Sequence, residues 1–429
     1  MPNSSVNAID LCATNVSQPP KYDYALEAIR GVAAILVVLE HCVSNGPNLD
    51  PNYRLGGLWQ YSAPGHLCVL IFFMLSGYVI GVSNAKPVNN AKSVKLYLKK
   101  RFVRLYPLYL ITIVFTVLVA ALYHTPYGVK IISSYLFFLQ GIAAPVPSYN
   151  QPIWSLSYEI LYYIIFIAVS RKQWNPNWVA LSFLLLGISI VLLKFPLIIL
   201  ASYSYGAVFW FIGLSLSRIP KSNEPIRYGT MLAFLVLMLS FQRMNLFLSF
   251  LATLHIDLSA EFFPNFFDRA ISFSDFSLLV YCVPVILCFT NRNVIGQRLL
   301  ELLAFVIPGL YLGAYIISGK IFHSALFNTL FINMVFYFLA LVIYLFRNVS
   351  SEIGRKIIFL LMPLGKISYG IYIIHYPLIF LFQRVTWFSG TGGGFLVRLF
   401  LYFTVVIILA RLLEIHFQPW IRGKMFKQA

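Results

Sequence analysis

An arginine and a histidine stand near opposite ends of an apolar stretch close to the start of the chain. The stretch, LEAIRGVAAILVVLEHC, runs from Leu26 to Cys42 and carries Arg30 and His41 eleven residues apart. Eleven residues make almost three turns of an α-helix, so both side chains project from one face, about 16 Å apart along the axis. Titratable groups inside a membrane helix are costly and usually face a protein interior or a wet cavity. The pair therefore predicts a functional site.

Two further arginines belong to a basic segment, KSVKLYLKKRFVRLYPLY, that precedes the third apolar stretch. Its basic residues before the first proline are Lys92, Lys95, Lys99, Lys100, Arg101 and Arg104. We interpret the lysines as an ordinary basic loop that touches anionic headgroups. Arg101 and Arg104 lie at i and i+3, where two guanidinium groups can clamp a phosphate in a bidentate way. They predict a site for a nucleotide-bearing substrate at the inner mouth of the third helix.

A carboxylate occurs within the first two turns of another expected helix, in WSLSYEILYY at 154–163. One interpretation is that Glu159 is simply favourable near a helix N-terminus. The other is that Glu159 is buried facing His41, where it orients the imidazole and stabilises its protonated form. Trp154 has a plain explanation as an interfacial anchor.

A polar stripe is expected in LGKISYGIYIIHYPLIF at 364–380. Tyr372 and His375 are three residues apart and Ser368 and His375 are seven apart, so they share one helix face with Tyr369 beside them. A lone histidine in such a helix can also just hydrogen-bond a neighbouring helix. We predict that the stripe lines a cavity. The small residues Ser76 and Gly77 of FFMLSGYVI are most simply explained by close helix packing.

The composition places these groups in a polytopic membrane protein. Of 429 residues, 59% are hydrophobic and 11% charged, which is too apolar for a soluble globular protein of this size. The formal charge of +18 fits basic cytoplasmic loops, and no nucleic-acid-binding motif accompanies it. The five cysteines show neither CxxC nor Cys/His metal spacing, so we predict no disulfide framework and no metal site.

Twelve apolar stretches are long enough to span a membrane, and the fold class expected is an all-α bundle of 10–12 transmembrane helices. Basic residues alternate between the stretches so that both termini are expected in the cytoplasm. A further patch at 135–142 is too short to span. The stretches are 26–44, 67–83, 104–122, 153–170, 177–194, 197–217, 229–250, 275–290, 300–318, 324–346, 366–385 and 394–413.

The chain divides into one large membrane domain and two tails. Residues 1–22 are polar and lack the pattern of a cleaved signal peptide, so they are expected to form a cytoplasmic tail. The transmembrane domain is expected at 23–421 and a cytoplasmic C-terminal tail at 422–429. No internal repeat or soluble domain is visible, and the connection at about 245–274 is too short for a catalytic domain.

Five blocks of this sequence resemble, in the same order, the signature blocks of the acyltransferase 3 family. The blocks are LEAIRGVAAILVVLEH, FFMLSGYVI, RFVRLYPLY, WSLSYE and LGKISYGIYIIHYPL, and the resemblance covers roughly Tyr24 to the C-terminus. Members of this family are integral membrane O-acyltransferases of bacterial surface sugars and related acceptors. The resemblance implies a cytoplasmic acyl-CoA donor, expected to be acetyl-CoA as substrate rather than cofactor, and a hydroxyl of a glycan or glycolipid as acceptor.

The resemblance also implies roles for the residues that match. Arg30 and His41 form the essential pair, Arg101 and Arg104 form the family's basic element, and Glu159 and His375 belong to one central cavity. In this scheme His41 is the general base and Glu159 holds its tautomer. Arg101 and Arg104 hold CoA phosphates, while Arg30 steers the pantetheine arm or stabilises developing charge. The residues expected to line the cavity are Trp154, Ser157, Tyr369, Tyr372 and His375.

Several alternatives remain open at this point. An acyl-His41 intermediate is one, and Ser155, Ser157 and Cys42 are weaker nucleophile candidates because nothing places a base beside them. Glu40 and Leu70 depart from the family pattern, which bears on the acceptor. A transporter or flippase of lipid-linked sugars would also bury such charges, and a non-catalytic partner would keep the fold. The expected location is the inner membrane, with partner proteins of surface-polysaccharide assembly.

Overall fold

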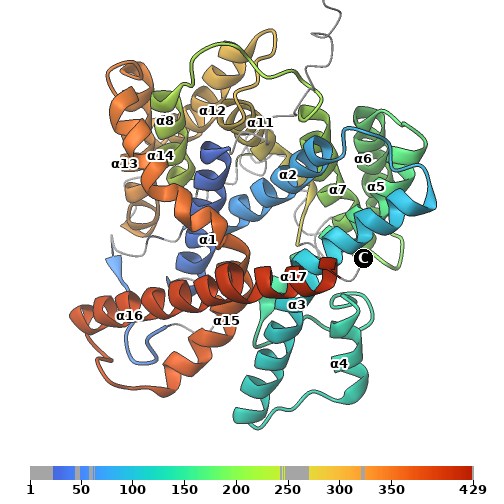
Figure 1. Ribbon diagram of the computed structural model, residues 1–429. Coiled ribbons are helices and arrows are strands. Elements are labelled where there is room, and N and C mark those ends of the chain that lie inside the picture. Colours follow the sequence, from blue (N-terminus) through green and yellow to red (C-terminus); the bar gives the residue numbers. More distant parts are fainter. Residues whose placement is uncertain are drawn as a thin grey trace, which may run out of the picture.

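The computed structural model of the protein is a bundle of helices. It describes residues 23–43, 49–57, 61, 63–241, 244, 246, 270–319 and 324–427. Within these ranges the ordered elements are helices, and β-type pairing is limited to two isolated bridges. In Figure 1, α5, α6 and α7 lie on one side of α2, whereas α8, α12, α13 and α14 lie on the other. The predicted all-α fold is confirmed.

The helices follow the chain in this order: α1 (Tyr24–Val43), α2 (Gly65–Ser83), α3 (Ala91–Leu122), α4 (Val129–Leu136), α5 (Trp154–Arg171), α6 (Pro176–Leu192), α7 (Ile199–Leu216), α8 (Tyr228–Ser240), α11 (Leu279–Phe289), α12 (Gln297–Ile317), α13 (Ser324–Leu345), α14 (Ser351–Lys366), α15 (Ser368–Arg384), α16 (Gly392–Arg411) and α17 (Gln418–Lys427). Short 3-10 helices precede α5 and α11, and a π-helical turn (Leu412–Phe417) joins α16 to α17.

Each of the twelve predicted stretches corresponds to a helix or part of one. Not all of these helices are long and apolar enough to cross a membrane. Six helices are long and apolar enough to cross a membrane, and α14 with α15, bent by 66°, makes a seventh as one broken span. Four shorter apolar helices include α6 and α8. The predicted N-terminal tail and most of the connection at 245–274 lie outside the described residues.

One segment differs from the sequence-based expectation. The basic segment before Pro107 is helical rather than a loop, because α3 begins at Ala91 behind a capping box formed by Asn90 and Ser93. The predicted C-terminal tail is helical as far as Lys427, where α17 ends. The patch at 135–142 consists of the end of α4 followed by turns, in keeping with its short length.

Two of the basic stretches predicted to share one side of the membrane lie together at one end of the bundle. Lys221, after α7, lies 3.4 Å from the carboxylate of Asp23, just before α1. Arg292, after α11, donates to the Tyr78 hydroxyl near the end of α2 at 2.8 Å. These contacts place the start of α1 and the ends of α2, α7 and α11 together. We refer to this end as the basic end; its cytoplasmic location stays a prediction.

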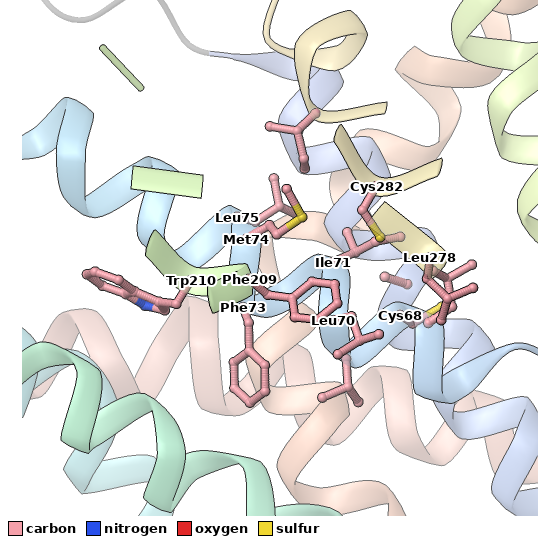
Figure 2. Close-up of a cluster of buried hydrophobic side chains, with 14 of the residues drawn as sticks. Cys68, Leu70, Ile71, Phe73, Met74, Leu75, Phe209, Trp210, Leu278 and Cys282 are labelled. Carbon is pink, nitrogen blue, oxygen red and sulfur yellow. The ribbon is translucent and has the colours of Figure 1, made fainter. Parts of the chain in front are cut away.

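The centre of the bundle is a close crossing of α2 and α7. A Cβ atom on Gly77 would lie 1.9 Å from the Trp210 carbonyl oxygen, and one on Gly213 would lie 2.0 Å from that of Met74. Figure 2 shows Met74, Leu75 and Trp210 packed at this crossing, with Cys68 and Cys282 beside them. Only glycine permits such an approach of two backbones. The close packing expected at Gly77 is therefore confirmed, and it fixes the position of α2.

A buried arginine ties together the connections at the other end of the bundle. Arg398 of α16 is 2% exposed, and its guanidinium donates to the Leu49 carbonyl at 2.9 Å and to the Trp387 carbonyl at 2.9 Å. It also donates to the carbonyls of Phe382 and Val385. The chain that follows α1 is thereby joined to the end of α15 and to α16.

An aspartate completes this tie. Asp50 lies 4.0 Å from Arg398 and accepts hydrogen bonds from the Ser389 hydroxyl and the backbone amides of Asn52 and Gly390. Burial acts to raise the pKa of the Asp50 carboxyl, but the three hydrogen bonds and the arginine charge together outweigh it and lower that pKa. The carboxylate is therefore charged and paired at neutral pH.

Replacing Arg398 by methionine should destabilise the protein markedly. Four backbone carbonyls would lose a donor and Asp50 would lose its buried counter-charge, which typically costs about 3–5 kcal/mol. Thermal unfolding of the detergent-solubilised protein, followed by tryptophan fluorescence, measures the effect. Arg411→Met, at the exposed end of the same helix, is the matched control. Equal melting temperatures for Arg398→Met and wild type would contradict the structural role.

Candidate functional site

Two histidines from opposite ends of the chain form a hydrogen-bonded pair. His41 Nδ1 of α1 lies 3.1 Å from His375 Nε2 of α15, although the two residues are 334 positions apart. The Tyr376 ring packs edge-on against His41, with ring centroids 5.1 Å apart. His375 is completely buried, whereas His41 is partly exposed. His41 is therefore the member of the pair that a substrate can reach.

The partners of His375 fix which nitrogen of His41 is free. His375 Nδ1 lies 2.8 Å from the Tyr372 carbonyl oxygen and 3.2 Å from that of Ile371. A carbonyl only accepts, so His375 Nδ1 carries the proton, and in the neutral ring Nε2 is an acceptor. His41 Nδ1 must then donate to it. This leaves the lone pair of His41 Nε2 unused within the pair, which is the state that a general base requires.

A cavity of about 410 Å³ lies beside this pair among α1, α2, α3, α5 and α15. From Ile80, near the basic end, to Val69 it extends over eleven residues of α2, or about 16 Å. Its charged lining residues are three acids, Asp23, Glu27 and Glu159, and three arginines, Arg30, Arg101 and Arg104. The deeper part is lined by Val69, Phe72, Leu156 and Tyr372. The cavity is thus charged near the basic end and mostly apolar at depth.

The three arginines differ in their partners. Arg30 forms an ion pair with Glu27 at 3.1 Å. Arg101 and Arg104 form no ion pair within the described part of the chain, although both line the cavity as the i, i+3 spacing predicts. Arg101 Nη2 contacts the Ser83 hydroxyl at 3.4 Å, and its Nε is buried without a hydrogen-bond partner. These two guanidinium groups are therefore available to an anionic ligand.

The prediction that Glu159 contacts and orients His41 is wrong, because the carboxylate has other partners. Glu159 accepts hydrogen bonds from the Ser76 hydroxyl at 2.7 Å and from the Tyr163 hydroxyl. Trp210 Nε1 in turn donates to Ser76 at 3.2 Å. The carboxylate faces α2 within the cavity, whereas His41 lies near the far end of α1 with His375 as its partner. Ser76 is thus part of a polar network as well as of the helix crossing.

The predicted lining residues divide into two groups. Tyr369 and Tyr372 line the cavity, whereas Trp154, Ser157 and His375 do not. Trp154 packs against the Tyr158 ring one turn along its own helix at 5.1 Å, whereas Ser157 accepts from the Tyr203 hydroxyl of α7 at 2.8 Å. His375 lies one turn beyond Tyr372, behind its ring. The polar stripe therefore begins in the cavity and ends at the histidine pair.

Sequence reasoning missed the pairing of His41 with His375 and the placement of Phe72 at the deep end of the cavity. The i, i+3 spacing of Tyr372 and His375 correctly indicated a shared face, but no signal in one sequence joins α1 to α15. No cluster of three or more metal-ligating side chains occurs among the described residues. Arg101 and Arg104 are the groups suited to bind phosphate.

Comparison with known proteins gives a consistent assignment. The model of the acyltransferase 3 family, described as an acyltransferase domain, matches residues 23–290. This range includes Arg30, His41, Arg101, Arg104 and Glu159 but ends before α15, although the resemblance noted above continues to the C-terminus. No solved structure matches the chain significantly.

Two curated proteins share part of the sequence. Acyltransferase MdmB of Streptomyces mycarofaciens is 27% identical over 173 residues, which cover 36% of this chain and 43% of that protein. Protein 2 in the picA locus of Rhizobium radiobacter is 34% identical over 96 residues, which cover 22% of this chain and 44% of that protein. The chain thus spans less than half the length of either relative. Because the family model matches more than half of the 429 residues, this chain belongs to the acyltransferase 3 family, and its long apolar helices fit a multi-pass membrane protein.

Proposed function

We propose that the protein transfers an acetyl group from acetyl-CoA to a hydroxyl of a surface polysaccharide or glycolipid. The observation that carries the proposal is the arrangement of one cavity and one histidine pair. Two arginines that form no ion pair among the described residues line the cavity near the basic end, and the histidine pair lies next to its apolar deep part. Membership of an acyltransferase family favours this reaction over the transport of lipid-linked sugars.

The donor enters from the basic end in this proposal. Arg101 and Arg104 bind CoA phosphates through charge-assisted hydrogen bonds. The pantetheine arm then follows the cavity past Arg30, and the thioester reaches the apolar part near Phe72 and Tyr372. Arg30 lies about 16 Å from His41 along α1, so it serves to steer the arm rather than to stabilise charge at the reacting carbonyl. Glu159 shapes the cavity wall through Ser76 and Tyr163.

The acceptor meets His41 from the opposite end. His41 Nε2 takes the proton of the acceptor hydroxyl while the oxygen of that hydroxyl attacks the thioester carbonyl. The tetrahedral intermediate collapses by breaking the carbon–sulfur bond, and the departing thiolate receives the proton from the imidazolium. An acyl-His41 intermediate would use the same nitrogen as nucleophile. His375 is a positioning residue that holds the His41 tautomer, the role that the sequence had suggested for Glu159.

The proposed reaction has a cellular setting that follows from its substrates. Acyl-CoA is cytoplasmic, so the basic end and both termini face the cytoplasm, in agreement with the positive-inside rule. The membrane is the inner membrane of a bacterial cell, and the acceptor is presented at its outer side. Proteins that assemble surface polysaccharide are the expected partners.

Removing the His41 imidazole should abolish transfer. Purified protein in detergent is incubated with radiolabelled acetyl-CoA and with lipid and glycan extract from its source, and label transfer and free CoA are followed. His41→Ala should lose at least about 100-fold in rate, as is typical for a general base. Transfer of label to a glycan fraction by wild type alone would support the proposal. Near-normal transfer by a folded His41→Ala variant would exclude the assigned role.

His375 provides a graded form of the same test. In His375→Gln the amide oxygen can still accept from His41 Nδ1, whereas leucine at 375 cannot. The expected order of rates is wild type, His375→Gln, His375→Leu, and the leucine variant should also shift the pH–rate profile because the His41 tautomer is no longer held. Identical pH–rate profiles for all three proteins would mean that His375 has only a structural role.

Replacing Arg101 or Arg104 by alanine should weaken acyl-CoA binding with little effect on kcat. Loss of one hydrogen bond to a charged group costs about 1.5–3 kcal/mol, which corresponds to a KM increase of about 10- to 150-fold. Steady-state kinetics with varied acetyl-CoA measure this change, and Lys92→Ala, on the exposed start of α3, is the control. An unchanged KM for both arginine variants would contradict phosphate binding at this place.

A further inference from the structure

Two aromatic rings meet in the deep part of the cavity. Phe72 of α2 and Tyr372 of α15 both line it, and their rings meet nearly edge to face with centroids 5.8 Å apart. The Tyr372 hydroxyl donates to the Pro152 carbonyl at 2.8 Å and lies 2.8 Å from the Ser155 hydroxyl. The Tyr372 ring is therefore held across the gap between α15 and the start of α5. We refer to Phe72 and Tyr372 as the aromatic wall.

The histidine pair lies directly behind this wall. The rings of Tyr372 and His375 have centroids 6.2 Å apart, and the Tyr372 carbonyl accepts from His375 Nδ1. Neither His41 nor His375 lines the cavity. The wall thus borders both the space that opens toward the basic end and the histidine pair, so an acyl carbonyl held against the Tyr372 ring lies next to the groups proposed to act as base and positioning residue.

We infer that the aromatic wall sets the length of the acyl group that the protein accepts. The inference rests on the proposed function, since it concerns the donor of that reaction. Arg101 and Arg104 fix the phosphates near the basic end, and the pantetheine arm has a constant length. Every acyl-CoA therefore places its sulfur at the same depth, and the chain beyond the sulfur must fit before the wall.

The chemistry of the wall favours a short chain. The neighbouring side chains at this depth, Val69 and Leu156, are apolar, so an acyl chain is tolerated there and a charged group is not. Displacing Tyr372 would break the hydrogen bond to Pro152 and disturb the carbonyl that holds His375. Long chains are rejected at this cost, while acetyl adds a single methyl group beyond the carbonyl. Phe72 has no polar group to lose, so it is the residue at which the space can be enlarged.

The test compares acyl-CoA donors of increasing length. Free CoA release is measured with acetyl-, butyryl-, hexanoyl- and octanoyl-CoA in the presence of acceptor extract, for wild type, Phe72→Ala and Phe72→Leu. The leucine variant removes less volume and carries the test if the alanine variant does not fold. Phe183→Ala is the matched control, because Phe183 is also a partly buried phenylalanine but stacks on Phe211 away from the cavity.

Wild type and Phe183→Ala should use acetyl-CoA best and octanoyl-CoA least. In the Phe72 variants, the rate with hexanoyl-CoA relative to acetyl-CoA should rise by at least about tenfold. One extra methylene in a pocket already changes the ratio of rates between two substrates by about that factor. An unchanged chain-length preference in an active Phe72 variant would overturn the role of the wall while leaving the proposed function intact. Failure of wild type to release CoA from any donor would instead remove the proposed function, and this inference with it.

Discussion

The hydrogen bond between His41 and His375 is the interaction on which the arrangement of the site depends. It joins the first helix of the domain to α15, and it connects through His375 Nδ1 to the backbone of Tyr372. Each link has one possible direction, because the carbonyl at its end can only accept. These hydrogen bonds, which end at the backbone of α15, therefore determine that the lone pair of His41 Nε2 is left unused. A change in the packing of α1 against α15 would alter chemistry and structure together.

The bundle separates two environments that the proposed acyl transfer would need. The cavity carries six charged side chains, most of them toward the basic end, whereas Val69, Phe72 and Leu156 line its apolar deep part. Glycine pairs such as Gly77 and Gly213 bring helices close enough to build these walls without bulky side chains between them. At the other end, Arg398 and Asp50 hold the connections that follow α1 and α15. The ends of the two histidine-bearing helices that lie away from the basic end are thus held together.

Much of the fold followed from the sequence, because lipid imposes simple requirements. Length, apolarity and the position of basic residues located all twelve stretches, and the i, i+3 spacing placed Arg101 and Arg104 on one wall. The helical start of α3 was missed because lysine-rich loops and lysine-rich helices have similar composition. Glu159 was assigned the wrong partner since α5 faces α2 rather than the end of α1. Periodicity describes one helix at a time, so it carries no information on which helices meet.

In the proposed reaction, the pairing of the arginines explains how a charged donor and a membrane-embedded site are compatible. The charge of Arg30, which lies deeper in the cavity, is neutralised by Glu27. Placing this arginine in a low-dielectric surrounding therefore adds little to the free-energy cost of forming the cavity. Arg101 and Arg104 keep unpaired charge, but they lie where the cavity approaches the basic end and water can solvate them until an anion arrives. The phosphates of a bound nucleotide are therefore most stable near that end, because moving them inward would replace the two arginines by the apolar side chains of Phe72 and Leu156. Only the uncharged acyl end gains by reaching the aromatic wall, and the distribution of charge along the cavity thereby orients the donor.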